Sequence, residues 1–250
     1  MYLKFFGYNK AKRRWIRRSY MRGKDMKYKV ILLDADNTLF DFNEAEVYAL
    51  EKTCQAVGQP YNEEVRQIYE KNNRVLWHDL EAGKIDMATL KIKRFEGFIK
   101  DLNINSDPKI MSELYMKYLG EGTFEIEGAY EMCQELSKSY ELIIVTNGIT
   151  AVQESRLERS RLKPFIKGMI TSEAVACSKP NPRIFDDALE LIQHKNKADV
   201  LMVGDSLTSD MQGGINAQID TCFYNPKGIT HDLEVTHEIK HLNELVEWLK

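Results

Sequence analysis

The sequence has no long apolar run and no clustered cysteines. Its longest apolar runs, such as Val30–Leu33 and Leu142–Val145, are of strand length and far too short to cross a bilayer. The four cysteines lie far apart without a CxxC pair, and no secretory signal is recognisable, so we expect reduced thiols in a cytoplasmic protein. Repeats and low-complexity tracts are also missing, while 43% of the 250 residues are hydrophobic. These features exclude a membrane span, a disulfide framework and a fibrous protein, and they predict a globular fold.

The formal net charge of −3 is unevenly distributed along the chain. Residues 1–27 carry ten Lys or Arg against one acid, Asp25, so this segment has a charge of +9 and the remainder has −3 − 9, or −12. An acidic body argues against nucleic acid as a partner, because binding a polyanion requires a basic surface. We interpret residues 1–27 as a basic leader outside the fold, with Met26 as a start point directly before the first strand. The alternative is a segment that contacts a membrane surface or RNA.

Short apolar runs alternate with helical patterns over the later part of the chain. Each run is nearly continuous and rich in β-branched residues, which is typical of strands covered on both faces. Strands that alternate with helices predict a doubly wound parallel α/β sheet with a Rossmann-like core. One helix has a clear start signal, with Asn181 as the N-cap and Pro182 at the first helical position. The expected strands lie at Val30–Leu33, Leu142–Val145, Met169–Thr171, Val200–Val203 and Thr221–Tyr224, and the later helices at Ala151–Arg161, Ile184–Ile192 and Asp210–Ala217.

The first two strands are separated by roughly a hundred residues that are mostly helical by period. A helical insert of this length is too long for a loop and predicts a second small domain. We therefore expect an α/β core at residues 28–42 and 124–250 and a helical domain at residues 43–123. The expected helices of the insert cover Asn43–Val57, Glu63–Leu80, Asp86–Leu102 and Pro108–Tyr118, and a further helix near Ala129–Lys138 belongs to the core.

Polar side chains follow the predicted strands at the edge where open parallel sheets bind ligands, the carboxyl ends of the strands. Taken singly, the Asp, Asn and Thr residues among them are ordinary turn and cap residues. Together they would bring four carboxylates, a lysine and a hydroxyl to one edge. A hard divalent cation, Mg²⁺, is the usual partner of such a cluster beside phosphate. The candidate site residues are Asp34, Asp36, Thr146, Asn147, Lys179, Asp205 and Asp210.

The spacing of Asp34 and Asp36 suits them to two successive roles. Along an extended segment they project to the same side. Asp34 can attack phosphorus as a covalent nucleophile, while Asp36 protonates the leaving oxygen and then activates water against the acyl phosphate. Asp205 would hold the metal, together with Asp34 and the backbone carbonyl of Asp36.

The remaining candidates would bind the phosphoryl group. Lys179 and Thr146, with Asn147, would contact the phosphoryl oxygens and neutralise the charge that develops on them. Asp210 would orient Lys179 or a metal-bound water. These residues predict a Mg²⁺-dependent phosphatase that forms an aspartyl-phosphate intermediate.

Four motifs, in this order, resemble those of the haloacid dehalogenase superfamily of phosphatases, and the resemblance covers residues 28–250. It implies a parallel sheet with the strand before Asp34 at its centre, and a helical cap domain that closes over the site and selects substrates. It also implies phosphatase or mutase chemistry, because members that break carbon–halogen bonds lack the second aspartate, here Asp36. The motifs are DADNT at 34–38, TNG at 146–148, SKP at 178–180 and GDSLTSD at 204–210.

Three longer stretches are similar to the pyrimidine 5′-nucleotidase branch, which acts on nucleotides such as UMP, dUMP and dTMP. They are DADNTLFDF at 34–42, LWHDLEAGKI at 76–85 and GDSLTSDMQGGINAQIDTCFYNP at 204–226. Asn37 stands where this branch is expected to carry an acid. We expect a small nucleotide as the partner and a monomer or small homo-oligomer. Two alternatives stay open: a sugar-phosphate phosphatase or phosphoglucomutase of the same superfamily, and a non-catalytic phosphate-sensing module.

Four side chains of the insert have both a functional and a structural interpretation. Trp77 and His78 could stack on a base or pack the insert against the core. Lys84 and Arg94 could reach the phosphate or the sugar, or only solvate a helix. The sequence leaves both interpretations open for each of them.

Two histidines near the C-terminus have helical spacing. His237 and His241 stand four apart, like a metal-binding pair, but no third ligand is apparent. We therefore expect them on a solvated terminal helix.

Overall fold

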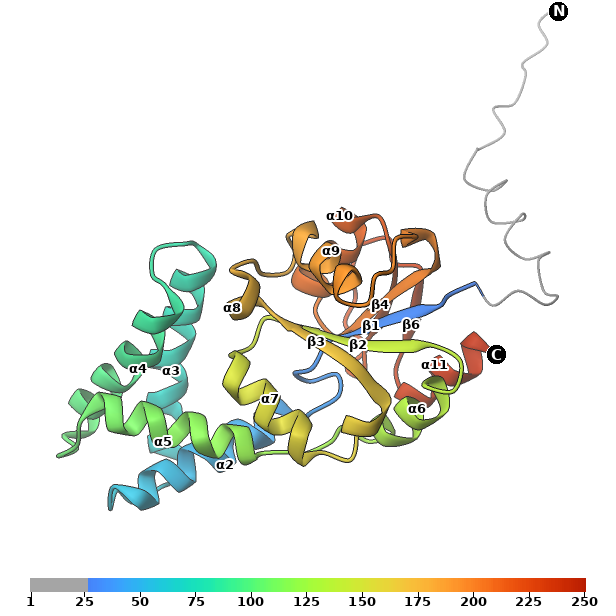
Figure 1. Ribbon diagram of the computed structural model, residues 1–250. Helices are drawn as coiled ribbons and strands as arrows, with labels where there is room; N and C mark the ends of the chain where they lie inside the picture. The colour runs from blue at the N-terminus through green and yellow to red at the C-terminus, as the bar shows by residue number, and fades with distance from the viewer. Residues whose placement is uncertain (1–26) are drawn as a thin grey trace, which may run out of the picture.

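The computed structural model describes residues 27–250, in which a six-stranded parallel sheet forms the centre of the fold (Figure 1). The strand order is β3-β2-β1-β4-β5-β6, so β1 lies between β2 and β4. This arrangement confirms the doubly wound sheet and places the strand before Asp34 at its centre. The predicted basic leader, residues 1–27, lies outside the described residues except for Lys27. The strands are β1 (Val30–Leu33), β2 (Glu141–Thr146), β3 (Ile166–Thr171), β4 (Val200–Gly204), β5 (Asp220–Tyr224) and β6 (His237–Ile239).

The expectation of a terminal helix that carries both histidines is wrong. His237 begins β6, where it pairs with Cys222, while His241 is the N-cap of α11 (Leu242–Leu249). The ring of His237 instead stacks on Trp248, with ring centroids 4.1 Å apart and planes 7° from parallel. A strand of three residues has no periodic signal of its own, and only its pairing with β5 identifies it as a strand.

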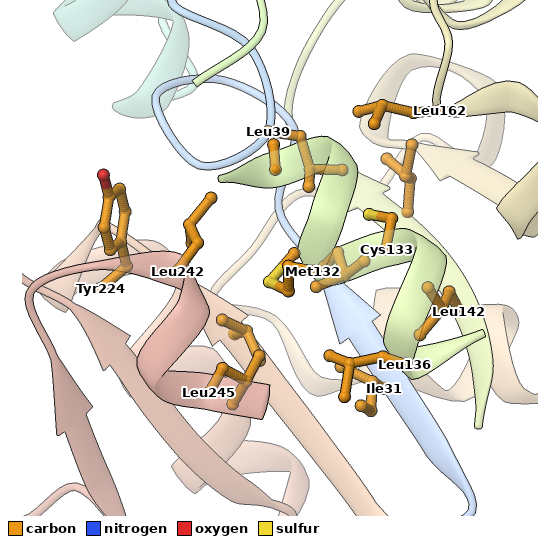
Figure 2. Packing of buried hydrophobic residues seen from close by; sticks show 14 of the residues in the cluster. Ile31, Leu39, Met132, Cys133, Leu136, Leu142, Leu162, Tyr224, Leu242 and Leu245 are labelled. Carbon is orange, nitrogen blue, oxygen red and sulfur yellow. The ribbon is translucent and has the colours of Figure 1, made fainter. Parts of the chain in front are cut away.

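One face of the sheet is covered by α6 (Ala129–Leu136) and α11. Figure 2 shows Met132 and Leu136 of α6 beside β1, and Leu245 of α11 belongs to the same buried cluster. Ile31 of β1 contributes to the same cluster and is fully buried. Burying these side chains removes apolar surface from water, which is the main source of the stability of the core.

The opposite face is covered by α9 (Pro182–Leu191) and α10 (Gln212–Ala217). Val30 and Leu32 of β1 point to this side, so β1 is buried on both faces as its continuous apolar run predicted. The start signal of α9 is confirmed, because the side chain of Asn181 accepts a hydrogen bond from the backbone N–H of Arg183 at 3.0 Å. The remaining elements of the core are α7 (Thr150–Arg159), α8 (Ser172–Val175), η1 (Lys163–Phe165), η2 (Lys197–Asp199) and the π-helix η3 (Leu207–Met211).

Four helices form the insert after β1, and aromatic side chains fill the core between them. Each begins at an Asp or Asn whose side chain accepts a backbone N–H, which is why the periodic segments start where they do. The helices pack around a buried cluster of four rings and also cover Ile149 and Val152 at the start of α7. The four rings are those of Tyr69, Phe95, Phe98 and Tyr115. The helices are α2 (Phe42–Ala56), α3 (Glu63–Glu81), α4 (Met87–Leu102) and α5 (Pro108–Glu121).

Two adjacent linkers join this helical insert to the sheet. The N–H of Asp41 donates to the carbonyl of Phe124 at 2.8 Å, and Phe40 forms an antiparallel bridge with Glu125. The chain thus leaves and re-enters the core side by side. We propose that residues 43–123 form a small helical domain, the cap domain that the family resemblance implies. None of the helices within residues 27–250 is long and apolar enough to cross a bilayer.

Candidate active site

Asp34 lies directly after the central strand, at the carboxyl edge of the sheet. Its N–H donates to the carbonyl of Val203 at 2.9 Å, which continues the pairing of β1 with β4 and fixes the position of Asp34. The chain then turns sharply, because Asn37 adopts a left-handed conformation (φ 62°) and Leu39 and Phe40 both donate to the carbonyl of Ala35. Asp34 is 6% exposed, so it is mostly buried at the carboxyl edge of the sheet.

Lys179 reaches the same edge from the loop before α9. Its Nζ lies 2.5 Å from Oδ1 of Asp34, 2.7 Å from Oδ1 of Asp210 and 2.7 Å from the carbonyl oxygen of Val145. Burial by itself would lower the pKa of this ammonium, but the charges of Asp210 and Asp34 outweigh it and raise the pKa of Lys179. Lys179 is therefore a fixed positive charge with three hydrogen-bond partners.

The loop after β2 supports Lys179. The carboxamide of Asn147 accepts from the N–H of Lys179 at 2.8 Å and donates to its carbonyl at 3.0 Å. Oγ1 of Thr146 accepts from the N–H of Gly148 at 3.0 Å, which leaves the hydroxyl hydrogen of Thr146 to donate. Asn147 thus holds the backbone of a predicted phosphate ligand, and the phosphate-binding roles of Thr146, Asn147 and Lys179 stay predictions.

Asp210 is placed by the π-helix after β4. Oδ2 of Asp210 accepts from the N–H of Ser206 at 3.0 Å, and the side chain of Ser206 caps the helix by accepting from the N–H of Ser209. Gly204, the last residue of β4, allows this close approach, because a Cβ there would lie 2.2 Å from Oδ2 of Asp210. The turn after β4 therefore brings the carboxylates of Asp205 and Asp210 to the same edge of the sheet.

The side chains of Asp34, Asp205 and Asp210 form one acidic cluster. They offer oxygen atoms that all lie within 4.8 Å of one another. Burial raises the pKa of Asp34, and burial together with the charge of Asp210 raises the pKa of Asp205 to about 6. Both shifts mean that the site holds more negative charge than its surroundings stabilise.

This cluster fits a divalent cation. In the part of the chain that the structure describes, Lys179 is the only cationic side chain paired with Asp34 or Asp210. Three carboxylates against one ammonium leave an excess of two negative charges, and hard oxygen ligands suit Mg²⁺. The predicted metal ligands Asp34 and Asp205 lie together, while a contribution from the backbone carbonyl of Asp36 stays a prediction.

Asp36 is held by two side chains of α7 that sequence reasoning missed. Nε2 of Gln153 donates to Oδ2 of Asp36 at 2.7 Å, and Nη1 of Arg156 donates to Oδ1. Both α7 residues are buried. One sequence signal was available, because Gln153 and Arg156 stand three apart on the helix that follows the motif Thr146-Asn147-Gly148 and so share one helix face. A buried arginine on that face requires an acidic partner.

A cavity of about 570 Å³ connects this edge of the sheet with the helical insert. Trp77 and Arg94 line it, as their functional interpretation requires. Lys84 instead pairs with Asp79 at 2.8 Å, and His78 is exposed outside the cavity lining. A ligand with its phosphate at Asp34 would therefore extend toward α3 and α4.

Residues 28–218 match the family model described as haloacid dehalogenase-like hydrolase. The chain belongs to this family, and its class of reaction is the hydrolysis of phosphoric monoesters. PynA of Streptococcus pneumoniae, a pyrimidine 5′-nucleotidase, is 34% identical over 227 residues, which are 90% of this chain and 96% of that protein. YjjG of Escherichia coli, also named a pyrimidine 5′-nucleotidase, is 34% identical over 225 residues, which are 87% of this chain and 98% of that protein.

A solved structure agrees with these relatives. The crystal structure of the HAD-hydrolase YfnB from Bacillus subtilis, bound to magnesium, matches with a TM-score of 0.82 and 33% identity, and covers 90% of this chain and 99% of that one. The family resemblance drawn from the four motifs is confirmed, as is the similarity to the pyrimidine 5′-nucleotidase branch.

Proposed function

We propose that the protein is a Mg²⁺-dependent phosphatase that hydrolyses pyrimidine nucleoside 5′-monophosphates such as UMP, dUMP and dTMP. The observation that carries the proposal is the acidic cluster of Asp34, Asp205 and Asp210 around Lys179, with Asp36 two residues after Asp34. Two relatives at 34% identity named as pyrimidine 5′-nucleotidases support the choice of substrate.

In the first half-reaction, a carboxylate oxygen of Asp34 attacks phosphorus and the ester P–O bond breaks. Asp36 gives its proton to the departing nucleoside oxygen, and Lys179 neutralises charge on the phosphoryl oxygens. In the second half-reaction, water attacks the aspartyl phosphate and loses a proton to Asp36, and the P–O bond to Asp34 breaks to release inorganic phosphate. A bound Mg²⁺, with Asp34, Asp205 and the backbone carbonyl of Asp36 as proposed ligands, would stabilise negative charge on the phosphoryl group.

The cavity offers groups that suit a nucleoside. Trp77 is a half-buried ring on which a base can stack. Asn73 and Arg94 are buried and line the cavity, yet Oδ1 of Asn73 and both Nε and Nη2 of Arg94 have no hydrogen-bond partner within residues 27–250. Unsatisfied buried polar groups are costly, and a pyrimidine presents donors and acceptors of its own. We infer that these three residues face the base or the sugar.

Cellular location and assembly are also part of the proposal. Cys54, Cys133, Cys177 and Cys222 are free thiols, which suits a reducing compartment such as the cytoplasm. For the assembly, we expect a monomer or small homo-oligomer.

The test is phosphate release from a panel of UMP, dUMP, dTMP, AMP, GMP and glucose 6-phosphate, with Mg²⁺ and with EDTA. We expect higher kcat/KM for the pyrimidine nucleotides, loss of turnover with EDTA and its return with Mg²⁺. Equal kcat/KM for UMP and glucose 6-phosphate would reject the nucleotide assignment. Full activity after exhaustive chelation would reject the metal site, and absence of turnover on every substrate would favour a phosphate-sensing module.

A further inference from the structure

We propose that Gln153 and Arg156 of α7 are positioning residues that aim the carboxyl group of Asp36 at the leaving oxygen. The proposal rests on the proposed phosphatase function, in which Asp36 is the proton donor. Both oxygens of Asp36 are engaged, Oδ2 by Nε2 of Gln153 at 2.7 Å and Oδ1 by Nη1 of Arg156. A carboxyl group held at both oxygens cannot rotate freely about its side-chain bonds.

Arg156 is itself fixed in place from three directions. Its Nε donates to the carbonyl of Gly122 at 3.1 Å, and its Nη1 also donates to Oε1 of Gln153 at 3.3 Å. Its guanidinium lies over the ring of Phe40, 4.8 Å from the centroid. Because the Arg156 side chain is fully buried while 27% of the Asp36 side chain is exposed, the arginine forms a rigid support behind a carboxyl group that faces the cavity.

The support leaves Asp36 able to react. Each carboxylate oxygen can accept about two hydrogen bonds, so one contact at each oxygen leaves a lone pair for the substrate side. Proton transfer requires the two heavy atoms to approach within about 2.6–3.2 Å, and small errors of aim are costly. Holding both oxygens therefore sets the direction of transfer and keeps the reacting oxygen accessible.

A purely structural ion pair explains these contacts less well. Replacing a buried ion pair by apolar side chains of similar volume is often neutral or stabilising, so stability alone does not require a guanidinium here. Nη2 of Arg156 is also buried without a hydrogen-bond partner in residues 27–250, which is a cost that a stabilising pair would avoid. The unpaired Nη2 is explained if Arg156 is present to orient Asp36 for proton transfer rather than to stabilise the fold.

The test compares kcat/KM for UMP and for p-nitrophenyl phosphate in the wild-type enzyme, Arg156→Met, Arg156→Lys and Arg159→Met. The p-nitrophenolate ion leaves without a proton, whereas the nucleoside oxygen needs one. We expect Arg156→Met to lose about a hundredfold or more with UMP and less than about tenfold with p-nitrophenyl phosphate, because general acid catalysis is worth about 10²–10⁴. Arg156→Lys should recover part of the loss. Arg159→Met is the matched control on an exposed part of α7 and should behave as wild type.

Gln153→Met gives a second variant without the loss of a buried charge, and we expect the same selective loss for UMP at about tenfold. Equal losses on both substrates in folded variants, or wild-type turnover of UMP by Arg156→Met, would overturn the positioning role while leaving the phosphatase intact. Absence of turnover by the wild-type enzyme on both substrates would overturn the phosphatase proposal and this role together.

Discussion

Nζ of Lys179 lies 2.5 Å from Oδ1 of Asp34, although 145 residues separate them in the chain. The contact joins the end of the central strand to the loop before α9, and it holds the proposed nucleophile in one orientation. A carboxylate that attacks in line reacts faster when its orientation is fixed, because correct orientation of the reacting groups supplies a large share of catalysis.

The first prediction concerns this carboxylate. Asp34→Asn should reduce phosphate release from UMP by at least about a thousandfold, because the amide keeps the shape but cannot form the aspartyl phosphate. Circular dichroism should show an unchanged fold. Residual turnover within about tenfold of wild type would contradict the covalent route.

The second prediction concerns metal-free stability and pH. The pKa of Asp205 is raised from 3.8 to about 6, so the folded protein keeps this proton longer than the unfolded chain does. The contribution of Asp205 to stability is therefore complete below about pH 4 and is lost as the pH rises through about 6. The raised pKa of Asp34 acts in the same direction. Thermal unfolding in EDTA should show this decline, and Mg²⁺ should raise the midpoint more at about pH 7.5 than at about pH 5.

Asp205→Asn is the control for that experiment. Without the buried charge, the metal-free variant should be on the order of 1–3 kcal/mol more stable than wild type at about pH 7.5, since one pKa unit corresponds to about 1.4 kcal/mol. The variant should also lose most of the stabilisation by Mg²⁺. A wild-type midpoint that does not respond to Mg²⁺ at either pH would speak against a metal at this cluster.

The third prediction concerns the cavity in the insert. Trp77→Ala should raise KM for UMP by about tenfold and change kcat little, because stacking on a base is worth about 1–3 kcal/mol. KM for p-nitrophenyl phosphate, which has no base, should change less. His78→Ala is the matched control, since His78 is the adjacent residue and is exposed outside the cavity lining. An unchanged KM for UMP in Trp77→Ala would place the base elsewhere.

The fourth prediction concerns the close approach at the end of β4. A methyl group at Gly204 would lie 2.2 Å from Oδ2 and 2.4 Å from Cγ of Asp210, and Asp210 is held by Lys179 and by the N–H of Ser206. Gly204→Ala should therefore displace this carboxylate and lower kcat by about a hundredfold or more. Steady-state kinetics with UMP should show that Gly204→Ala and Asp210→Asn lower kcat by similar factors. Wild-type kcat in Gly204→Ala would mean that the position of Asp210 is not important for turnover.

Much of the fold could be predicted because its signals are local. A continuous apolar run such as Val30–Leu33 indicates a strand buried on both faces, and a side-chain cap such as Asn181 marks a helix start within a few residues. β6 was missed for the opposite reason. Its three residues carry no period, and only the pairing of Ile239 with Tyr224 makes them a strand.

The sequence by itself determined which residues follow the strands of the sheet, and with them the meeting of Asp34, Asp205 and Asp210 at one edge. Parallel strands all end at the same edge, so strand order along the chain was enough. Only the tertiary structure decided that Asp36 lies against α7. The contact between Asp36 and Arg156 spans 120 residues and depends on how α7 packs against the loop after β1. Such a contact has no local periodicity, because it results from the packing of two whole elements rather than from the pattern within either one.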